Sequence, residues 1–416
     1  MGDDRFDILV SGGGIAGLMA TAIFAQSGFR TLCTDPTPPV TDEASEGADL
    51  RSTAFLQPAQ ALLAETGLWD RLAPFATPLQ TMRIVEAAGD GATVARAFEA
   101  TDVSELPFGW NLPNWLVRRE LTQHLSGLAN ATFCPGVGTK SVLPRSTEAL
   151  AWLSDGRRLR VQLIVAADGR NSGIRQALGI PAQTTRYGQK ALAFAVTHPR
   201  PHGFVSTEIH RSGGPFTLVP LPDRDGLPAS AVVWMTDGPD AVRLSALPDA
   251  AFNAEMTARA AGLYGPLTLA SRRTIWPIIS QIAARFHGER TALIAEAAHV
   301  VPPIGAQGLN MSLADIRVLR DLALGGRDAL GNASMLDRYT QSRWPEVRAR
   351  LAGIDALNRV SKSGGSVVPA LRAQGIKLIH DIPPVRRALM HAGLGAAPQK
   401  TSSTTDFSRD SAPSTS

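Results

Sequence analysis

The glycine-rich turn near the N-terminus constrains the fold more than any other part of the sequence. Residues 6–10 read FDILV, as a buried strand would, and the next seven residues read SGGGIAG, which fits the pattern G-x-G-x-x-G. A helix is predicted after them, and residues 30–34 predict a second strand that ends at Asp35, about 20 residues after the glycines. This order of strand, turn, helix, strand and acid is typical of a Rossmann-like domain that binds a dinucleotide.

Each residue of the pattern has a physical role. Gly12 permits the tight turn, and Gly14 lets the pyrophosphate of a dinucleotide approach the backbone. Gly17 lets the helix pack closely on the strand. The carboxylate of Asp35 can accept hydrogen bonds from a ribose diol. The pattern predicts a dinucleotide without saying which one.

A second strand–loop–helix unit spans residues 291–319. Residues 292–295 predict one buried strand that ends at the acid Glu296. A loop with two glycines follows, and Asn310 is predicted to cap a helix whose apolar residues repeat at helical spacing. Such a loop brings backbone N–H groups close to a flat or anionic ligand, and the helix N-terminus adds a positive partial charge. Each feature alone fits an ordinary link, but together with the N-terminal turn they predict a cofactor site.

Two further stretches carry candidate cofactor residues. The apolar residues 163–167 predict another strand, which ends at Asp168 and Gly169. Asp168 could be only a turn-former before glycine, but a second acid at a strand end favours a role at the same site. Arg51 follows a polar segment and could reach a bound cofactor or form a surface ion pair; both interpretations stay open.

Composition excludes several other classes of protein. The 416 residues are 44% hydrophobic and 19% charged, as in a globular protein with a large core. No run of eighteen apolar residues occurs and the acidic N-terminus is unlike a signal peptide, so we expect a cytoplasmic protein. Cys33 and Cys134 lack metal-like spacing, so we predict neither a metal site nor a disulfide. We expect no nucleic-acid partner. Nine Lys or Arg against three acids in residues 342–391 indicate either an anionic contact surface or solvated helix faces.

We predict an α/β fold with a discontinuous organisation. Residues 1–80, 110–183 and 280–340 are assigned to a Rossmann-like domain of the glutathione-reductase type. Residues 81–109 and 184–279 are rich in strand-like segments broken by Pro and Gly, and they predict an inserted β-sheet substrate domain. Residues 341–395 predict C-terminal helices. Residues 396–416 are rich in Ser and Thr and predict a disordered tail.

Three motifs make the chain resemble a known family. They are the GGGIAG turn, the segment ADGRNSGIR that begins at Ala167, and the stretch AEAAHVVPPIGAQGLNMSLAD at residues 295–315. Within the last of these, the tract HVVPPIGAQGLN is the most specific. They are similar to motifs of the FAD-dependent aromatic hydroxylases of the para-hydroxybenzoate hydroxylase type, and within them of the ubiquinone-biosynthesis hydroxylases. The resemblance covers roughly residues 5–395.

The resemblance implies a set of cofactor-binding residues. By this likeness Gly12, Gly14 and Gly17 would hold the FAD pyrophosphate, Asp35 the adenosine ribose and Glu296 the ribityl chain, while Arg51 and Arg118 would lie along the cofactor. Asp168 and Gly169 would serve both FAD and the incoming NADH or NADPH. The isoalloxazine would be lined by Pro303, Gly305, Gly308, Leu309 and Asn310.

One departure from the family pattern concerns the ribityl site. The family has Gly-Asp where this chain has Ala295-Glu296. Glutamate keeps the carboxylate but adds a methylene, and Ala295 adds a methyl group where the backbone and the cofactor approach each other. A displacement of about 1 Å would either be absorbed or weaken FAD binding.

The resemblance also implies the chemistry. NADH or NADPH would reduce FAD, O2 would give a flavin C4a-hydroperoxide, and its distal oxygen would attack an activated phenol. No side chain stands out as a catalytic acid or base; His299 is a candidate, although a histidine beside such a loop more often belongs to the core.

The substrate would be a polyprenylated phenol of ubiquinone biosynthesis. The C-terminal helices would then contact the inner face of a membrane or other ubiquinone-biosynthesis proteins. Two alternatives stay open: a hydroxylase of a soluble aromatic or polyketide substrate, and a flavin-poor scaffold of a biosynthetic complex.

Overall fold

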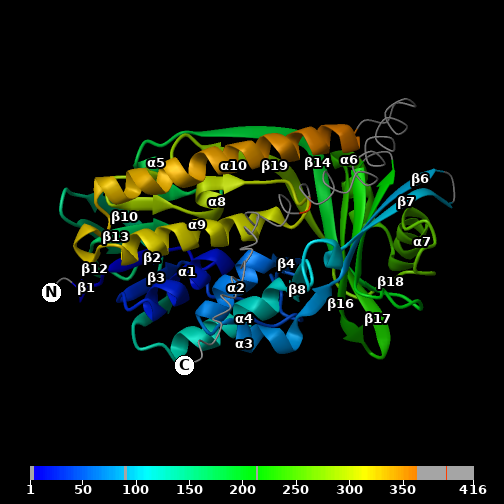
Figure 1. The fold of residues 1–416 in the computed structure, drawn as a ribbon, viewed down its shortest axis with the longest axis horizontal. Coiled ribbons are helices and arrows are strands. Elements are labelled where there is room, and N and C mark those ends of the chain that lie inside the picture. The colour runs from blue at the N-terminus through cyan, green and yellow to red at the C-terminus, as the bar shows by residue number, and fades with distance from the viewer. Residues whose placement is uncertain (1–3, 89–90, 212–213, 363–389, 391–416) are drawn as a thin grey trace, which may run out of the picture.

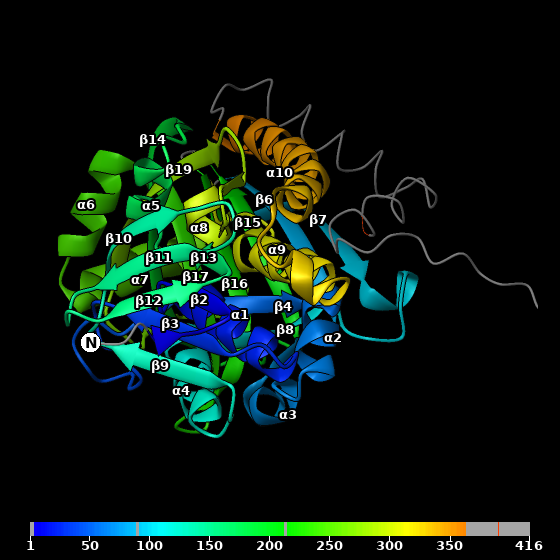
Figure 2. The same ribbon diagram turned by 90° about the vertical axis from the view of Figure 1, so that its left-hand side faces the viewer.

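A computed structural model describes residues 4–88, 91–211, 214–362 and Met390 (Figure 1). It has both helices and sheets, and the strands β13, β2 and β3 run parallel beside one another (Figure 2), so the predicted α/β class is confirmed. The nine-stranded sheet lies at the end of the molecule away from the N-terminus (Figure 1).

A six-stranded sheet carries the glycine-rich turn. Its order is β20-β21-β13-β2-β3-β9, and all of its pairs except β20–β21 are parallel. The strands are β2 (Ile8–Ser11), β3 (Thr31–Asp35), β9 (Ala131–Pro135), β13 (Leu163–Ala166), β20 (His287–Gly288) and β21 (Thr291–Leu293). Every residue of β2 and β13 is buried, as expected for parallel strands covered on both faces.

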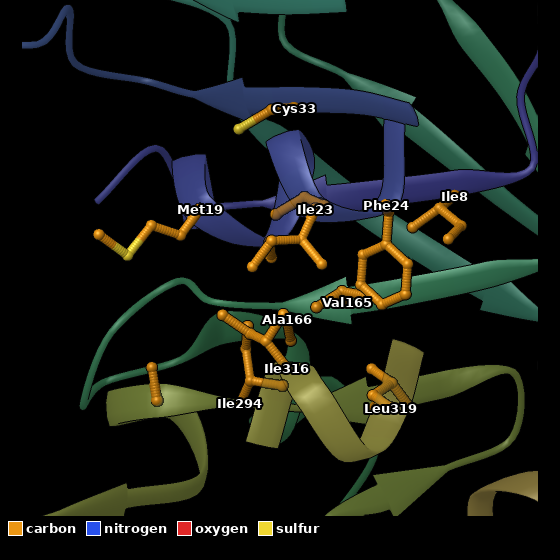
Figure 3. Close-up of a cluster of buried hydrophobic side chains, with 14 of the residues drawn as sticks. Ile8, Met19, Ile23, Phe24, Cys33, Val165, Ala166, Ile294, Ile316 and Leu319 are labelled. Atoms are coloured by element: carbon orange, nitrogen blue, oxygen red, sulfur yellow. The ribbon is translucent and has the colours of Figure 1, made fainter. Parts of the chain in front are cut away.

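The core of this part joins segments that are far apart in the sequence. Helix α1 (Ile15–Gln26) packs against α4 (Asn114–Ser126) and α9 (Gln307–Leu324). Figure 3 shows Ile23 and Phe24 of α1 beside Val165 of β13, with Ile316 and Leu319 of α9 on the far side. The two strand–turn–helix units predicted from the sequence therefore share one hydrophobic core.

The nine-stranded sheet forms the second part of the molecule. Its order is β22-β19-β14-β17-β16-β15-β6-β7, with β18 paired to β14. The strands are β6 (Thr81–Ala88), β7 (Gly91–Glu99), β14 (Ala182–Thr197), β15 (Val205–Arg211), β16 (Gly214–Arg224), β17 (Leu227–Asp237), β18 (Thr268–Leu269), β19 (Thr274–Ala283) and β22 (His299–Val300). The division of the chain into the predicted domain ranges stays a prediction, although two hydrophobic cores are present.

The two faces of this sheet meet different neighbours. Paired residues of adjacent strands point to the same face. One row packs with α6 (Gly238–Ala246) and α7 (Asp249–Arg259) in the second core; it consists of Leu192, Trp234, Phe216, Ile209 and Val85. The next row points the other way; it consists of Ala193, Val233, Thr217, Glu208 and Ile84. Val233 of this row packs with Met235 and Ile304, so this second face, called the inner face below, turns toward the loop before α9.

Two small sheets and several short elements complete the fold. The sheets have the orders β4-β8-β5 and β1-β12-β11-β10. Their strands are β1 (Asp4–Arg5), β4 (Ser52–Leu56), β5 (Thr77–Leu79), β8 (Gly109–Pro113), β10 (Thr139–Pro144), β11 (Ala149–Leu153) and β12 (Arg158–Val161). The remaining helices are α2 (Gln57–Glu65), α3 (Trp69–Leu72), α5 (Gly173–Ala177), α8 (Ala295–Ala298) and α10 (Ala333–Lys362), with short 3-10 turns at Ala73–Phe75, Ala100–Asp102 and Arg327–Ala329.

Two local predictions around residue 300 are wrong, and one helix elsewhere was missed. The strand after residue 290 ends at Leu293, and Ala295 and Glu296 begin the short helix α8 instead of ending the strand. Helix α9 begins at Gln307, three residues before the predicted cap Asn310, because Ala306 takes a left-handed conformation (φ 55°) that starts the helix early. Helix α6 was not predicted at all.

The C-terminal predictions fall largely outside the described residues. Helix α10 covers the first predicted C-terminal helix, but residues 363–389 and 391–416, including the predicted tail, are not described. Within the described ranges, the model contains no helix of sufficient length and hydrophobicity to cross a membrane.

Candidate functional site

The three glycines of the N-terminal turn differ in what surrounds them. A Cβ atom on Gly12 would lie 2.3 Å from the carbonyl oxygen of Ala167, and one on Gly17 would lie 1.8 Å from that of Gly12. Both positions therefore exclude any side chain, and Gly12 also has a φ of +111°, which favours glycine. A Cβ on Gly14 would meet no atom within 4 Å. The backbone of Gly14, which caps α1, thus faces open space into which a ligand can fit.

Asp35 lies beside the glycine turn, where the fingerprint places it. One of its carboxylate oxygens accepts a hydrogen bond from the backbone N–H of Gly13 at 2.6 Å, and the other accepts one from Thr37 at 2.8 Å. The carboxylate is therefore held at the end of β3, next to the turn. This is the position from which a ribose diol could be bound.

Asp168 and Arg118 each carry a buried polar atom without a partner. Oδ2 of Asp168 accepts a hydrogen bond from the backbone N–H of Ile174, but Oδ1 is buried and has no hydrogen-bond partner among the described residues. Nε of Arg118 is likewise buried and unpartnered in this part of the chain. Because buried polar atoms are normally satisfied, both side chains have capacity for a ligand. Gly169 follows with a φ of +83° and open space at its Cα.

Arg51 has protein partners as well as a place near the cofactor site. Its guanidinium donates two hydrogen bonds to Asp49, at 2.7 and 2.8 Å, and lies 4.4 Å from the ring centre of Trp276. Burial lowers the pKa of Arg51, but the carboxylates of Asp49 and Glu296 raise it by more. Asp49 also accepts a hydrogen bond from Asn114, so this arginine links β4, α4 and β19.

At Ala295 and Glu296, where the chain departs from the family pattern, the backbone takes an unusual conformation. Ala295 has a φ of +53°, a left-handed conformation that glycine adopts without cost and that costs alanine roughly 1 kcal/mol. Its backbone N–H donates to Asp315 at 3.3 Å. Glu296 is exposed in the first turn of α8. Its carboxylate attracts the guanidinium charge of Arg51 and so raises the pKa of Arg51. The carboxylate of the longer acid is thus exposed and close enough to Arg51 to affect its pKa.

Asn310, in the first turn of α9, joins the end of the loop at residues 301–306 to strand β4. Its side-chain oxygen accepts from the N–H of Leu56 at 2.9 Å, and its amide donates to the carbonyls of Ala54 and Ala306. Asn310 therefore fixes the loop instead of capping α9. The other loop residues predicted to line an isoalloxazine are exposed or half-exposed: Pro303, Gly305, Gly308 and Leu309.

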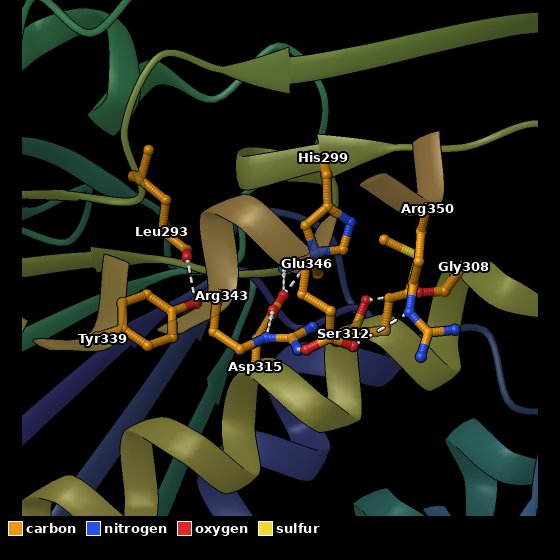
Figure 4. Close-up of polar contacts among 11 residues, drawn as sticks. Leu293, His299, Gly308, Ser312, Asp315, Tyr339, Arg343, Glu346 and Arg350 are labelled. Carbon is orange, nitrogen blue, oxygen red and sulfur yellow. Dashed lines mark hydrogen bonds and ion pairs between the residues drawn. The ribbon is translucent and has the colours of Figure 1, made fainter. Parts of the chain in front are cut away.

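A buried ionic cluster lies behind this loop (Figure 4). Asp315 of α9 is fully buried; its Oδ2 lies 2.6 Å from Nε2 of His299 and its Oδ1 accepts from Nε of Arg343 at 2.8 Å. Burial alone would raise the pKa of Asp315, but His299 and Arg343 lower it by more, so it lies below its usual value. His299, the catalytic candidate, is only 2% exposed, and its Nε2 is bonded to Asp315, so its imidazole belongs to this cluster.

A polar pocket of about 520 Å³ is lined in part by Arg170 and Asn171, which follow Asp168 in the chain. Three arginines and no acid line it: Arg170, Arg175 and Arg186. Arg175 is 5% exposed, donates to the carbonyls of Arg170 and Ala297, and has no carboxylate partner among the described residues. Burial lowers its pKa. A cationic pocket of this size suits an anionic ligand.

Comparison with known proteins identifies the family. An FAD binding domain model matches residues 5–352. The ubiquinone hydroxylase UbiL of Rhodospirillum rubrum is 32% identical over 94% of this chain and 90% of its own length. The human mitochondrial ubiquinone biosynthesis monooxygenase COQ6 is 26% identical over 93% of this chain and 92% of its own.

This chain belongs to the FAD-dependent aromatic hydroxylases. The crystal structure of p-nitrophenol 4-monooxygenase PnpA from Pseudomonas putida matches with a TM-score of 0.76 over 94% of this chain and 99% of that one, at 19% identity, which shows the shared fold. The resemblance predicted from the three motifs is therefore confirmed, and the cofactor is FAD. The open backbone at Gly14 and the unpartnered atoms of Arg118 and Asp168 fit such a cofactor.

Sequence reasoning missed the residues that support the site from behind. Asp49 and Asn114 hold Arg51, and Asp315 and Arg343 hold His299. Asp315 is the last residue of the third family motif, but no role was assigned to it. Asp49, Asn114 and Arg343 stand in no recognisable motif, since Asp49 lies in a polar segment and Arg343 lies on an ordinary helix. A single acid at a buried position of a helix was the one available signal, at Asp315. Among the described residues no cluster suited to a metal ion occurs.

Proposed function

We propose that this FAD-dependent monooxygenase hydroxylates the aromatic ring of a polyprenylated phenol in ubiquinone biosynthesis, with NADH or NADPH and O2 as co-substrates. The observation that carries the proposal is the 32% identity to a ubiquinone hydroxylase over nearly the whole of both chains. Bound FAD, once reduced, supplies an electrophilic oxygen from O2. The protein supplies binding, orientation and a dry site.

We infer the FAD contacts from the positions of the residues described above. Gly14 and the N-terminus of α1 would meet the pyrophosphate, and Arg118 would offset its charge. Asp35 would bind the adenosine ribose. Glu296, exposed at the start of α8, would replace the usual aspartate at the ribityl chain. The loop at residues 301–310 would lie along the isoalloxazine.

The arginine pocket supports the choice of a nicotinamide nucleotide as reductant. Arg170 follows directly on Asp168 and Gly169, and Arg175 touches α8 through the carbonyl of Ala297. The guanidinium groups of Arg170 and Arg186 line the pocket without a hydrogen-bond or ion-pair partner among the described residues, so they can bind phosphates. Replacing both by Gln should raise the KM for NADH or NADPH at least about tenfold, since charged hydrogen bonds contribute roughly 1.5–3 kcal/mol each, and should leave FAD content unchanged.

An apolar substrate fits the inner face of the nine-stranded sheet. Ala191, Met235 and Ile278 form an apolar cluster there, and Ile304 of the loop packs against it. Val233 and Thr217 in the next row are half-exposed, unlike the buried residues on the opposite face. An aromatic ring with an isoprenoid chain would lie against this face beside the isoalloxazine.

We further propose that the protein binds the surface of a membrane to reach such a substrate. The basic and apolar side chains that would make this contact lie outside the described residues, at positions 367–387. Neutralising Arg372, Lys377, Arg386 and Arg387 should reduce co-sedimentation with anionic liposomes. Unchanged co-sedimentation would contradict the membrane contact without touching the catalytic proposal.

The first experiment is an FAD titration of the purified protein, followed by anaerobic NADH or NADPH and then by O2 with 2-prenylphenol. Micromolar or tighter FAD binding, bleaching of the flavin and a hydroxylated phenol are the expected results. Hydroxylation of a soluble aromatic acid but not of a prenylated phenol would favour the alternative hydroxylase. No nucleotide oxidation at saturating FAD would favour a scaffold and overturn the proposal.

A further inference from the structure

The inner face of the nine-stranded sheet carries a histidine–glutamate pair. His210 lies two residues after Glu208 on β15, so both side chains point to the same face. Glu208 stands in the row of Ala193, Val233 and Thr217, which faces the loop before α9. With strands spaced about 4.8 Å apart, Glu208 is roughly 10 Å from Val233, within the span of one aromatic substrate.

The two side chains bind each other and leave one nitrogen free. Nε2 of His210 lies 2.8 Å from Oε1 of Glu208, so the carboxylate accepts a hydrogen bond from that nitrogen. Nδ1 of His210 is buried and has no hydrogen-bond partner among the described residues. In a neutral imidazole whose Nε2 carries the proton, Nδ1 is a bare acceptor. An unsatisfied acceptor of this kind costs free energy unless a ligand donates to it.

Charged residues of both signs lie on the elements around His210. Glu86 of β6 is paired in register with His210, and Glu208 binds it directly. The other neighbour on the sheet, Pro215, is uncharged. Helix α10, which packs against β16, carries Asp355 and, one turn further on, Arg359. The direct contact with Glu208 is what orients the imidazole.

We propose that His210, oriented by Glu208, is the base that removes the phenolic proton of the substrate. This inference rests on the proposed function. The phenol O–H bond breaks, its electron pair stays on oxygen and the proton forms a new N–H bond at Nδ1. The phenolate charge spreads to the ring carbons, which then attack the electrophilic oxygen supplied with FAD. The C–O bond forms as the O–O bond of that oxygen breaks, and the imidazolium gives its proton to the oxygen atom left behind. The attacked ring carbon then loses its hydrogen as a proton when the ring becomes aromatic again, so no further reactant is needed.

The need for such a base follows from the acidity of phenols. A phenol with a pKa of about 10 is ionised to about one part in a thousand at pH 7. Positioned general bases typically contribute 10²–10⁴-fold to a rate. His210 has the acceptor atom and the orienting partner that this role requires.

The test compares wild-type holoenzyme with the variants H210Q and E208Q in hydroxylation of 2-prenylphenol between pH 6 and pH 10. We expect H210Q to lower product formation at pH 7 at least about 100-fold. O2 consumption should continue with H2O2 as the product, and FAD content should stay unchanged. The deficit should shrink toward pH 10, where the phenol ionises unaided. E208Q should show the same pH pattern with a smaller deficit.

H198Q is the matched control. His198 is also buried in this sheet, at 2% exposure, but both of its ring nitrogens have partners, Ser230 and the carbonyl of Arg200. Its substitution removes a buried imidazole but leaves Glu208 and His210 unchanged, so product per bound FAD should stay within twofold of wild type.

Two results would overturn the proposal. The first is an H210Q enzyme whose product yield matches wild type at pH 7, and the second is a deficit that does not change with pH. A wild-type protein that binds FAD but hydroxylates no phenol would instead overturn the proposed function, and the role of His210 with it.

Discussion

Replacing Arg343 by methionine tests whether the buried ionic cluster holds the cofactor site together. The side chain of Arg343 is 2% exposed and that of Asp315 is not exposed at all. Methionine keeps an unbranched apolar stem of similar length but removes the donor to Asp315 and the donor to the carbonyl of Met311. A buried carboxylate is then left with His299 and one backbone N–H as its partners.

The expected loss of stability is large. Breaking a buried ion pair by removing one partner typically costs 3–5 kcal/mol, because the remaining charge stays buried. For a chain of 416 residues the entropy of unfolding is about 0.9 kcal/mol per kelvin, so the melting temperature should fall by about 3–6 °C. The control is Arg350→Met, about two turns further along α10. Its ion pair with Glu346 is partly exposed, so the substitution should lower the free energy of unfolding by less than about 1 kcal/mol.

The same variant should change the response to acid. The pKa of folded Asp315 lies below its usual value because His299 and Arg343 outweigh the effect of burial. Its contribution to stability is therefore fully present above the unfolded pKa of about 3.9 and is lost as the pH falls through the lower folded pKa. Without Arg343 the folded pKa rises, so this contribution is lost at a higher pH and acid unfolding should begin earlier.

The assay is thermal unfolding of the FAD-free protein at pH 7 and across pH 3–6, with FAD affinity measured in parallel. FAD affinity should also fall, because Asp315 accepts from the N–H of Ala295 at the turn before Glu296. A variant that melts within 1 °C of wild type, while Arg350→Met behaves as expected, would refute the reasoning. So would an unchanged onset of acid unfolding.

Three further predictions concern the cofactor groove and the thiols. Gly17→Ala should destabilise the protein by about 3 kcal/mol or more in thermal unfolding, because its Cβ would lie 1.8 Å from a backbone oxygen. Gly14→Ala should leave the stability unchanged, because its Cβ would meet no atom, but it should weaken FAD binding in titrations. Ala295→Gly should stabilise the protein by up to about 1 kcal/mol by relieving the left-handed alanine, and lower stability would contradict this. Burial raises the pKa of Cys33 to about 12, so a thiol reagent at pH 8 should label only the half-buried Cys134 until the protein unfolds.

Local sequence patterns were sufficient for the parts of the fold that are built from neighbouring residues. Strand β2, the glycine turn and helix α1 follow one another within the first 26 residues, and their apolar pattern and glycine spacing can be read directly. Residues 81–109 were predicted to be strand-like for the same reason, and β6 and β7 pair there as antiparallel neighbours.

Interactions between distant residues could not be predicted. Asp315 and Arg343 lie on different helices, and nothing in their spacing indicates that they meet. Asn310 was assigned to a helix cap because its residue type suits that position, but its partners, Ala54 and Leu56, lie more than 250 residues away. The pair of Glu208 and His210 alternates in sequence as any exposed strand would, and only the sheet register shows which face it occupies.

The buried cluster explains how the chain keeps its departure from the family pattern at Ala295. A left-handed alanine persists only where the surrounding structure holds it in place. Here Asp315 accepts from its N–H, and Tyr339 of α10 donates to the carbonyl of Leu293 just before it. Asp315 can remain charged in the core because His299 and Arg343 surround it. Helix α10 therefore stabilises the turn that presents Glu296, so the FAD-binding part of the chain should not fold without it.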